Sequence, residues 1–265
     1  MKIHLLIIDP QKDFVEKTGS LFVGGATDDM DRLAVMVDKH KKQIDEINCT
    51  MDSHRTLHVA SPILWKDSKG DHPAPFTVIT YKDVVDGVWS ASKPSLQRKL
   101  EEYVKALEAT GKYNLCIWPP HCLIGSEGWT VNNGLFRAFS AWETDQFGIV
   151  NYVTKGSNIY TEHYGALKAE VEDPKDPSTS INIGLVQSLM AADLIGIAGE
   201  ALSHCLLTTV TQVADAFGND NYIKKMVLLE DCSSAIPGFE TQVADFLKNM
   251  KTRGMQVSDS KHFLS

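Results

Sequence analysis

Residues 193–199 read DLIGIAG, and the chain then continues as EALSHC to Cys205. A short apolar run bounded by glycine is typical of a strand buried in a parallel sheet. From Cys205 to Phe217 the pattern is helical, and Gly218 is a good helix stop. We therefore predict that Cys205 lies between a strand and a helix, at the start of that helix. The positive end of a helix dipole favours the thiolate form of a thiol placed there.

Two more strand-like runs end in a charged side chain. Residues 5–8 (LLII) end in Asp9, and residues 149–154 (IVNYVT) end in Lys155. The carboxyl ends of parallel strands meet at one edge of a sheet, where small ligands bind. An acid and an amine brought to the same edge as the thiol of Cys205 predict a nucleophilic site.

Apolar, β-branched runs alternate along the chain with longer amphipathic ones, which favours a parallel sheet with crossover helices. The predicted strands are 3–9, 46–52, 115–118, 149–155, 194–199 and 226–230, with a short and less regular seventh run at 255–257. The predicted helices are 29–43, 96–110, 134–147, 179–191, 205–217 and 238–250. We predict an α/β fold with three αβα layers around a doubly wound, six-stranded parallel sheet.

A single domain over residues 1–265 is expected, because no Pro/Gly/Ser-rich linker or block of like charge divides the chain. Residues 59–111 interrupt the alternation with four prolines and several aromatic side chains, and they contain one predicted helix. We interpret this segment as an inserted excursion between two core strands. It either covers a site at the carboxyl edge, as lids do, or forms a surface elaboration or a subunit contact.

Composition limits the partners. A formal net charge of -8 and the lack of a basic stripe argue against nucleic acid and anionic membranes as partners. The five cysteines are odd in number and lack paired spacing, which indicates a reduced, cytoplasmic protein. The apolar run at residues 5–8 is too short for a signal peptide, and no run approaches the roughly 20 residues that span a bilayer.

A second group of side chains suits a divalent metal such as Zn²⁺. Asp52 and His54 close a predicted strand two residues apart, so their side chains point to one side. His121 follows the third predicted strand at the same edge, and a carboxylate with imidazoles is a common zinc ligand set. His58 is either a fourth ligand or a partner that supports one. An Asp-x-His pair alone also occurs in proteins without a metal, so the structural alternative stays open.

These segments resemble one family. Residues 6–14 (LIIDPQKDF) are similar to the opening of the nicotinamidase branch of the isochorismatase-like cysteine hydrolases. The segments DSH at 52–54, WPPHCLIG at 118–125, KG at 155–156 and GEA at 199–201 before Cys205 follow in that family's order and approximate spacing. The resemblance covers nearly the whole chain apart from residues 59–111. Its most specific part is the tryptophan–proline–x–histidine–cysteine segment.

The resemblance implies an amidohydrolase that converts nicotinamide to nicotinate and ammonia through a thioester. Cys205 would be the nucleophile, and the charge of Lys155 would hold its thiolate. Asp9 would accept the thiol proton, pass it to the leaving nitrogen and then activate water. The N–H groups of Ala201 and Cys205 would form the oxyanion hole, and the peptide bond before Ala201 would be cis.

The resemblance also implies a cofactor and a way to hold the substrate. Asp52, His54 and His121 would bind a divalent metal, with zinc as the first candidate, that anchors the ring nitrogen of the small carboxamide. Phe14 and Trp118 would sandwich the ring. Members of the family form various oligomers, so a homo-oligomer is an expectation that the sequence leaves open.

Several positions depart from the family pattern. The family has an apolar residue where Glu200 stands, and residues 160–165 (YTEHYG) replace an aspartate–serine–aromatic–serine segment. Glu162, His163, His204 and Glu200 either line the pocket with polar groups that nicotinamide does not need, or act as hydrogen-bond partners and surface caps. Two alternatives follow. One is a related metal-independent amidase or ureido-hydrolase acting on another small amide, and the other is a non-catalytic small-molecule binder or thiol sensor.

Overall fold

A six-stranded sheet forms the centre of the molecule, in a computed structural model that describes residues 1–265. The strands lie in the order β10–β9–β8–β1–β2–β7, and every neighbouring pair is parallel. Their bounds are β1 Ile3–Ile8, β2 Glu46–Asp52, β7 Asn151–Lys155, β8 Leu194–Gly199, β9 Met226–Leu229 and β10 Gln256–Ser258. The chain starts in the middle of the sheet and adds strands first on one side and then on the other. The predicted fold class, a doubly wound parallel sheet, is confirmed.

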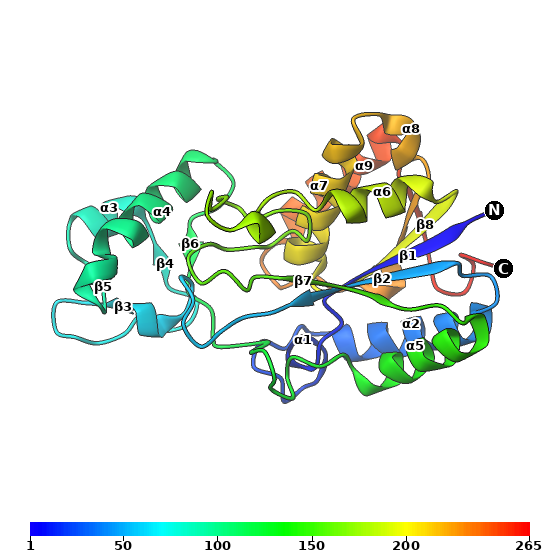
Figure 1. Cartoon of the computed structure of the whole chain (residues 1–265), viewed down its shortest axis with the longest axis horizontal. Helices are drawn as coiled ribbons and strands as arrows, with labels where there is room; N and C mark the ends of the chain where they lie inside the picture. The colour runs from blue at the N-terminus through cyan, green and yellow to red at the C-terminus, as the bar shows by residue number, and fades with distance from the viewer.

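Helices cover both faces of the sheet (Figure 1). One layer holds α2 (Ala26–His40) and α5 (Asn133–Gln146), with the short α1 (Lys12–Val15) at its end. The other layer holds α6 (Ile183–Ala191), α7 (Leu207–Phe217), α8 (Asp220–Ile223) and α9 (Glu240–Arg253). A π-helical turn, Leu202–Leu206, leads directly into α7, and short 3-10 turns lie at Pro62–Leu64, Pro94–Leu96, Pro177–Thr179 and Glu230–Cys232.

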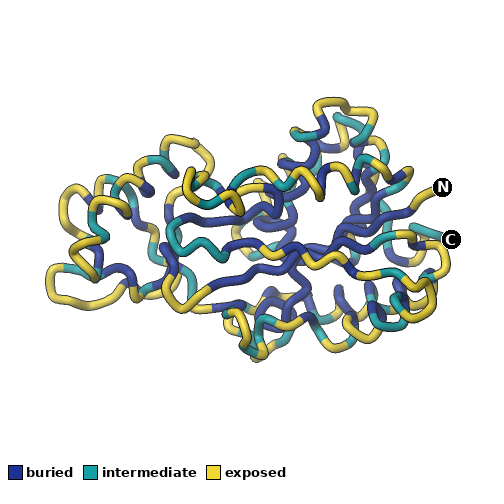
Figure 2. Tube along the Cα trace, in the orientation of Figure 1, coloured by how far each residue is buried: buried dark blue, intermediate teal, exposed yellow.

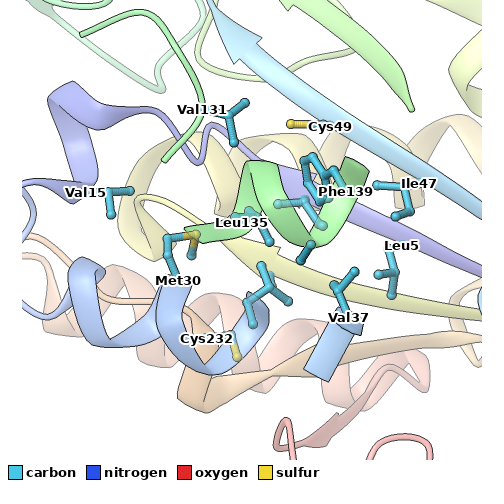
Figure 3. Close-up of a cluster of buried hydrophobic side chains, with 14 of the residues drawn as sticks. Leu5, Val15, Met30, Val37, Ile47, Cys49, Val131, Leu135, Phe139 and Cys232 are labelled. Carbon is cyan, nitrogen blue, oxygen red and sulfur yellow. The ribbon is translucent and has the colours of Figure 1, made fainter. Parts of the chain in front are cut away.

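Strand β1 is apolar along most of its length because it is buried on both faces. Leu5 faces the core beneath α2 and α5, where it packs with side chains such as Val37 and Phe139 (Figure 3). Leu6, the next residue, points to the opposite face and packs in the core beneath α6 and α7. This alternation explains why residues 5–8 of the strand are all apolar rather than alternating in polarity.

The excursion predicted for residues 59–111 builds a small lobe beside the sheet (Figure 1). The lobe extends past the predicted excursion to residue 117, and it contains β3 Trp65–Lys66, β4 Val78–Ile79, α3 Tyr81–Val85, β5 Ser90–Ala91, α4 Gln97–Ala109 and β6 Leu115–Cys116. The strands form two antiparallel pairs, β3 with β5 and β4 with β6. Thirteen buried side chains, among them Trp65, Leu100 and Ile117, give the lobe a core of its own.

One predicted strand of the central sheet is wrong. Residues 115–118 contribute only the short β6, which pairs with β4 in the lobe, and the sixth strand of the sheet is β10, from the less regular run at 255–257. Leu115 and Ile117 are buried, as a strand prediction requires, but in the core of the lobe. Hydrophobicity shows that a run is buried and does not show against which core it packs.

The fold places the functional residues at one edge. The carboxyl ends of the strands face the lobe, whereas the two chain termini lie at the opposite side of the molecule (Figure 1). The order of strands reverses between β1 and β8, and ligands of doubly wound sheets bind at such a switch point. The residues at the carboxyl ends of these two strands are buried (Figure 2). No helix has the length and apolar character needed to cross a membrane.

Candidate active site

Three strands deliver the predicted acid, amine and thiol to one point. Asp9 follows β1, Lys155 ends β7, and Cys205 lies in the turn after β8. The ammonium nitrogen of Lys155 is 2.9 Å from Asp9 Oδ2 and 3.5 Å from Cys205 Sγ. All three side chains are buried, so the structure brings the predicted group together in a site with little water.

The end of β2 holds the carboxyl group of Asp9. The hydroxyl of Thr50 donates to Asp9 Oδ1 at 2.5 Å, and the Asp9 N–H donates back to that hydroxyl at 3.0 Å. Asp9 has a positive φ of 43°, an uncommon backbone conformation for a residue other than glycine. Thr50 was not predicted from the sequence, because a threonine inside a buried strand carries no signal of its own.

The charges show what form the groups take at rest. Burial raises the pKa of the Cys205 thiol well above its usual range, although the ammonium of Lys155 opposes this effect. Burial lowers the pKa of Lys155, but the carboxylates of Asp52 and Asp9 outweigh it and raise that pKa well above its usual range. The resting group is therefore a neutral thiol beside a charged ammonium, with Asp9 as the nearest proton acceptor. Lys155 by itself does not make a thiolate here.

The predicted metal ligands also converge. Asp52 Oδ2 lies 3.0 Å from His54 Nε2 and 3.3 Å from His121 Nε2, and one ligand atom from each residue lies within 4.8 Å of the others. All three side chains are buried. His121 Nδ1 is 2.7 Å from the Pro119 carbonyl and donates to it, which leaves the lone pair on Nε2 facing the cluster. One carboxylate and two imidazoles at this spacing fit a divalent metal.

His58 does not join this cluster. Its Nδ1 accepts a hydrogen bond from the Ala60 N–H at 3.3 Å, so its Nε2 carries the proton and donates to the Thr161 carbonyl at 3.2 Å. Both ring nitrogens are therefore occupied by backbone groups. The ring packs edge-on against His54 at 4.4 Å between centroids, so His58 supports a cluster residue rather than offering a lone pair.

A cavity that opens to solvent joins the two groups. Its lining includes the predicted ring contacts Phe14 and Trp118 together with Lys155, Cys205, Asp52, His54, His121, Ala201, Glu162, His163 and His204. Glu200 does not line it. Glu162, His163 and His204 thus line the cavity, which is one of the two alternatives that the sequence left open. Glu200 is buried away from the cavity.

The turn between β8 and α7 carries the predicted oxyanion-binding groups. The peptide bond between Glu200 and Ala201 is cis. The Ala201 N–H donates no hydrogen bond within the chain, so it is free to bind a ligand. Cys205 lies in the π-helical turn, two residues before the first residue of α7, rather than at the first residue of the helix as predicted.

Two further residues organise the site and were not singled out from the sequence. Gln11 accepts a hydrogen bond from the Asp52 N–H and donates to the Asp52 carbonyl, both at 2.7 Å, and so joins the ends of β1 and β2. Asp13 Oδ2 accepts from the Cys122 N–H at 2.6 Å and holds the segment that carries His121. Both residues lie in the opening motif 6–14, which was the available signal.

No family model matches this chain, and no curated protein matches it by sequence. Solved structures do match it. The yeast nicotinamidase Pnc1p superposes with a TM-score of 0.66 at 18% identity, over 98% of this chain and 100% of that one. PnC1 from L. infantum, solved with nicotinate, gives 0.59 at 19% identity over 98% and 93%. The pyrazinamidase of Pyrococcus horikoshii, solved with zinc, gives 0.56 at 15% over 98% and 100%.

These comparisons show that the chain has the fold of the nicotinamidases. Because 98% of the chain is covered, the match also includes most of the lobe at residues 59–117, which the motif resemblance did not reach.

Proposed function

We propose that this protein is a cysteine amidohydrolase that converts nicotinamide and water to nicotinate and ammonia. The observation that carries the proposal is the convergence of Asp9, Lys155 and Cys205 on a buried point beside a cavity that also holds the cluster of Asp52 and two histidines. The shared fold with nicotinamidases of yeast and other organisms supports the same choice of substrate.

In the first half-reaction the sulfur of Cys205 attacks the carboxamide carbon while Asp9 takes the thiol proton. A C–S bond forms, and the carbonyl oxygen becomes an oxyanion that the N–H groups of Ala201 and Cys205 stabilise. Asp9 then gives its proton to the amide nitrogen. The C–N bond breaks, ammonia leaves, and the acyl group remains as a thioester on Cys205.

In the second half-reaction Asp9 takes a proton from water, and the resulting hydroxide attacks the thioester carbon. The C–S bond breaks, the carboxylic acid leaves, and the proton held by Asp9 returns to the sulfur. Lys155 stays protonated throughout, since two carboxylates raise its pKa, and its charge stabilises the sulfur anion as that anion forms.

Asp52, His54 and His121 would hold a divalent metal, which supplies a Lewis acid for the pyridine nitrogen of the substrate. We propose zinc, because the ligand set suits it and the pyrazinamidase of P. horikoshii was solved with it. Phe14 and Trp118 line the same cavity from the opening motif and from the lobe, and we propose that they contact the two faces of the ring.

A second candidate is an amidase or ureido-hydrolase of the same mechanism that acts on a more polar amide. Glu162 Oε1 and His163 Nε2 are buried and have no hydrogen-bond partner in the protein, although both residues line the cavity. Unpaired buried polar groups cost free energy unless a ligand or water satisfies them. A substrate with further donors or acceptors on its ring or side group would do so.

The deciding experiment measures ammonia release from nicotinamide, pyrazinamide, benzamide and small ureido compounds. We expect nicotinamide to give the highest kcat/KM and Cys205→Ala to abolish turnover. Cys116→Ser is the matched control, because that thiol lies outside the cavity of the site and is half-buried. Preference for a ureido compound selects the second candidate. A wild-type protein that binds these amides and releases no ammonia refutes catalysis altogether.

A further inference from the structure

Glu200 is a fully buried carboxyl group directly beside the turn that carries Ala201. It lies outside the lining of the active-site cavity, so it does not contact a substrate bound there. An isolated carboxylate without water costs several kcal/mol or more, so a glutamate in this place requires partners. The mechanism proposed above leaves the residue unexplained.

The partners of Glu200 lie on two other segments. Its Oε2 accepts a hydrogen bond from the Ser234 N–H at 3.2 Å, and its Oε1 is buried without a hydrogen-bond partner, with the charge of Asp29 in α2 acting on the carboxyl group. Asp29 in turn accepts from the Ser234 hydroxyl at 2.5 Å and pairs with Arg32 at 2.5 Å. The backbone repeats the connection, because the Leu202 N–H donates to the Ser234 carbonyl at 2.8 Å. Glu200 and Leu202, which flank Ala201, are thus both hydrogen-bonded to Ser234.

The protonation of this group follows from its surroundings. Burial, with the nearby charge of Asp29, raises the pKa of Glu200 well above its usual range. The raised pKa favours the neutral acid, which can donate its proton to Asp29. This accounts for its Oε1 atom, which is buried and receives no hydrogen bond. A neutral acid with one donor and one acceptor is what the two partners require.

We infer that Glu200 is a positioning residue, which fixes the Ala201 N–H relative to the sulfur of Cys205 by tying the turn to Ser234 and Asp29. This inference rests on the proposed function, since it assigns the Ala201 N–H to the oxyanion. The turn enters from β8 through the Glu200 N–H, which donates to the Ile8 carbonyl at 2.8 Å. The side chain of Glu200 thus holds the turn at the point where the backbone hydrogen bonds of the sheet end.

Two substitutions separate hydrogen bonding from size. In Glu200→Gln the amide oxygen still accepts from the Ser234 N–H, and the amide nitrogen donates to Asp29, so activity within about threefold of wild type is expected. Glu200→Leu keeps a similar volume and loses both bonds. We expect its kcat to fall about 10- to 100-fold. The removal of a whole oxyanion donor lowers kcat by as much or more.

The readout must detect the oxyanion and not only the fold. Pyridine-3-carbaldehyde forms a tetrahedral adduct with a thiol and so probes the oxyanion-binding groups, whereas nicotinate probes ring binding alone. We expect Glu200→Leu to weaken the aldehyde in parallel with kcat, while the nicotinate Kd and the nicotinamide KM change little. All variants are assayed at a temperature below the lowest melting point measured.

Each outcome decides one question. If Glu200→Leu is as active as wild type, or loses nicotinate and aldehyde affinity equally, or does not fold, Glu200 is not a positioning residue. Equal impairment of Glu200→Gln and Glu200→Leu also refutes the inference. A wild-type enzyme that turns over no amide refutes the proposed function instead; the aldehyde and nicotinate titrations then still report on the turn.

Discussion

The thiol of Cys205 is held in a neutral state until a substrate arrives. Burial and the carboxyl group of Asp9 both favour the protonated sulfur, and the charge of Lys155 opposes them. A buried thiol of this kind resists oxidation, because the thiolate is the form that reacts. Lys155 lies 2.9 Å from Asp9 and 3.5 Å from the sulfur, so in the proposed mechanism the thiolate forms as the C–S bond forms.

Thr50 is the residue that sets the direction of the Asp9 carboxyl group, and Thr50→Val removes its hydroxyl at nearly constant volume. The Asp9 Oδ1 atom then loses its 2.5 Å donor in a buried site, which costs about 1–3 kcal/mol. We expect kcat/KM to fall about tenfold or more, because a misdirected base transfers protons poorly. Steady-state ammonia release checks this. Thr144→Val on the exposed side of α5 should leave kcat/KM unchanged, and an unchanged Thr50→Val enzyme contradicts the role given to Thr50.

At the scale of elements, the close contact of β1 with β8 brings Asp9 near the turn that carries Ala201 and Cys205. Ile8 pairs with Gly199 at the ends of the two strands. Gly199 has a φ of 117°, and a Cβ atom there would overlap the backbone of Ile8. Glycine is therefore required at this position both for its backbone conformation and for the close approach of the strands.

Gly199→Ala should separate the ends of β1 and β8. We expect the free energy of unfolding to fall by more than about 1 kcal/mol and the turnover to fall further than stability alone explains. Denaturant unfolding and ammonia release measure the two effects. Gly87→Ala is the control, since Gly87 also has a positive φ, of 74°, but open space around it. Equal losses in both variants would mean that backbone strain alone matters at Gly199.

At the scale of the whole molecule, the metal cluster joins the sheet to the lobe. Asp52 and His54 come from the end of β2, whereas His121 follows the last strand of the lobe. A metal bound by all three would stabilise the folded chain as a unit, because the unfolded chain does not preserve the cluster.

Zinc added to metal-free protein should therefore raise the melting temperature. At a hundredfold excess over Kd the gain is about 2.7 kcal/mol, which is about 5–10 °C for a chain of this size. The shift should disappear in His121→Ala and persist in His262→Ala, whose ring is exposed and lies outside the cluster. An unchanged melting temperature of the wild-type protein on addition of zinc or other divalent metals would refute the metal site.

Buried neutral histidines make the folded chain sensitive to acid. Burial lowers the pKa of His163 to about 3 and that of His204 to about 4. Both values lie below that of an unfolded histidine, so between about pH 6.5 and pH 4 the unfolded chain binds more protons and the free energy of unfolding falls as the pH falls. We expect a loss of about 2 kcal/mol for each histidine at about pH 5 in metal-free protein. Denaturant titrations should show a smaller pH slope in His204→Phe, and an unchanged slope would contradict this account.

Much of the fold could be predicted because strands and helices have local patterns. Five of the six predicted core strands lie in the sheet, and the helices end within a few residues of their predicted bounds. The prediction that residues 115–118 form a strand of the central sheet was wrong, because the run packs in the core of the lobe instead. That outcome depends on pairing with β4, which lies some 35 residues away along the chain. Helix α7 begins two residues later than predicted, because the π-helical turn at Leu202–Leu206 has no period that sequence reasoning separates from an α-helix.

The sequence by itself determined the sheet, its two helical layers and the strand ends at which Asp9, Lys155 and Cys205 meet. Buried strands and amphipathic helices could be predicted because their hydrophobic patterns involve residues that are close together in the sequence. Only the tertiary structure decided that the thiol is neutral, that backbone groups occupy both nitrogens of His58, and that Glu200 faces Asp29 and Ser234 instead of the cavity. Charge state and hydrogen-bond partners depend on burial and on groups from distant segments, and no local pattern carries that information.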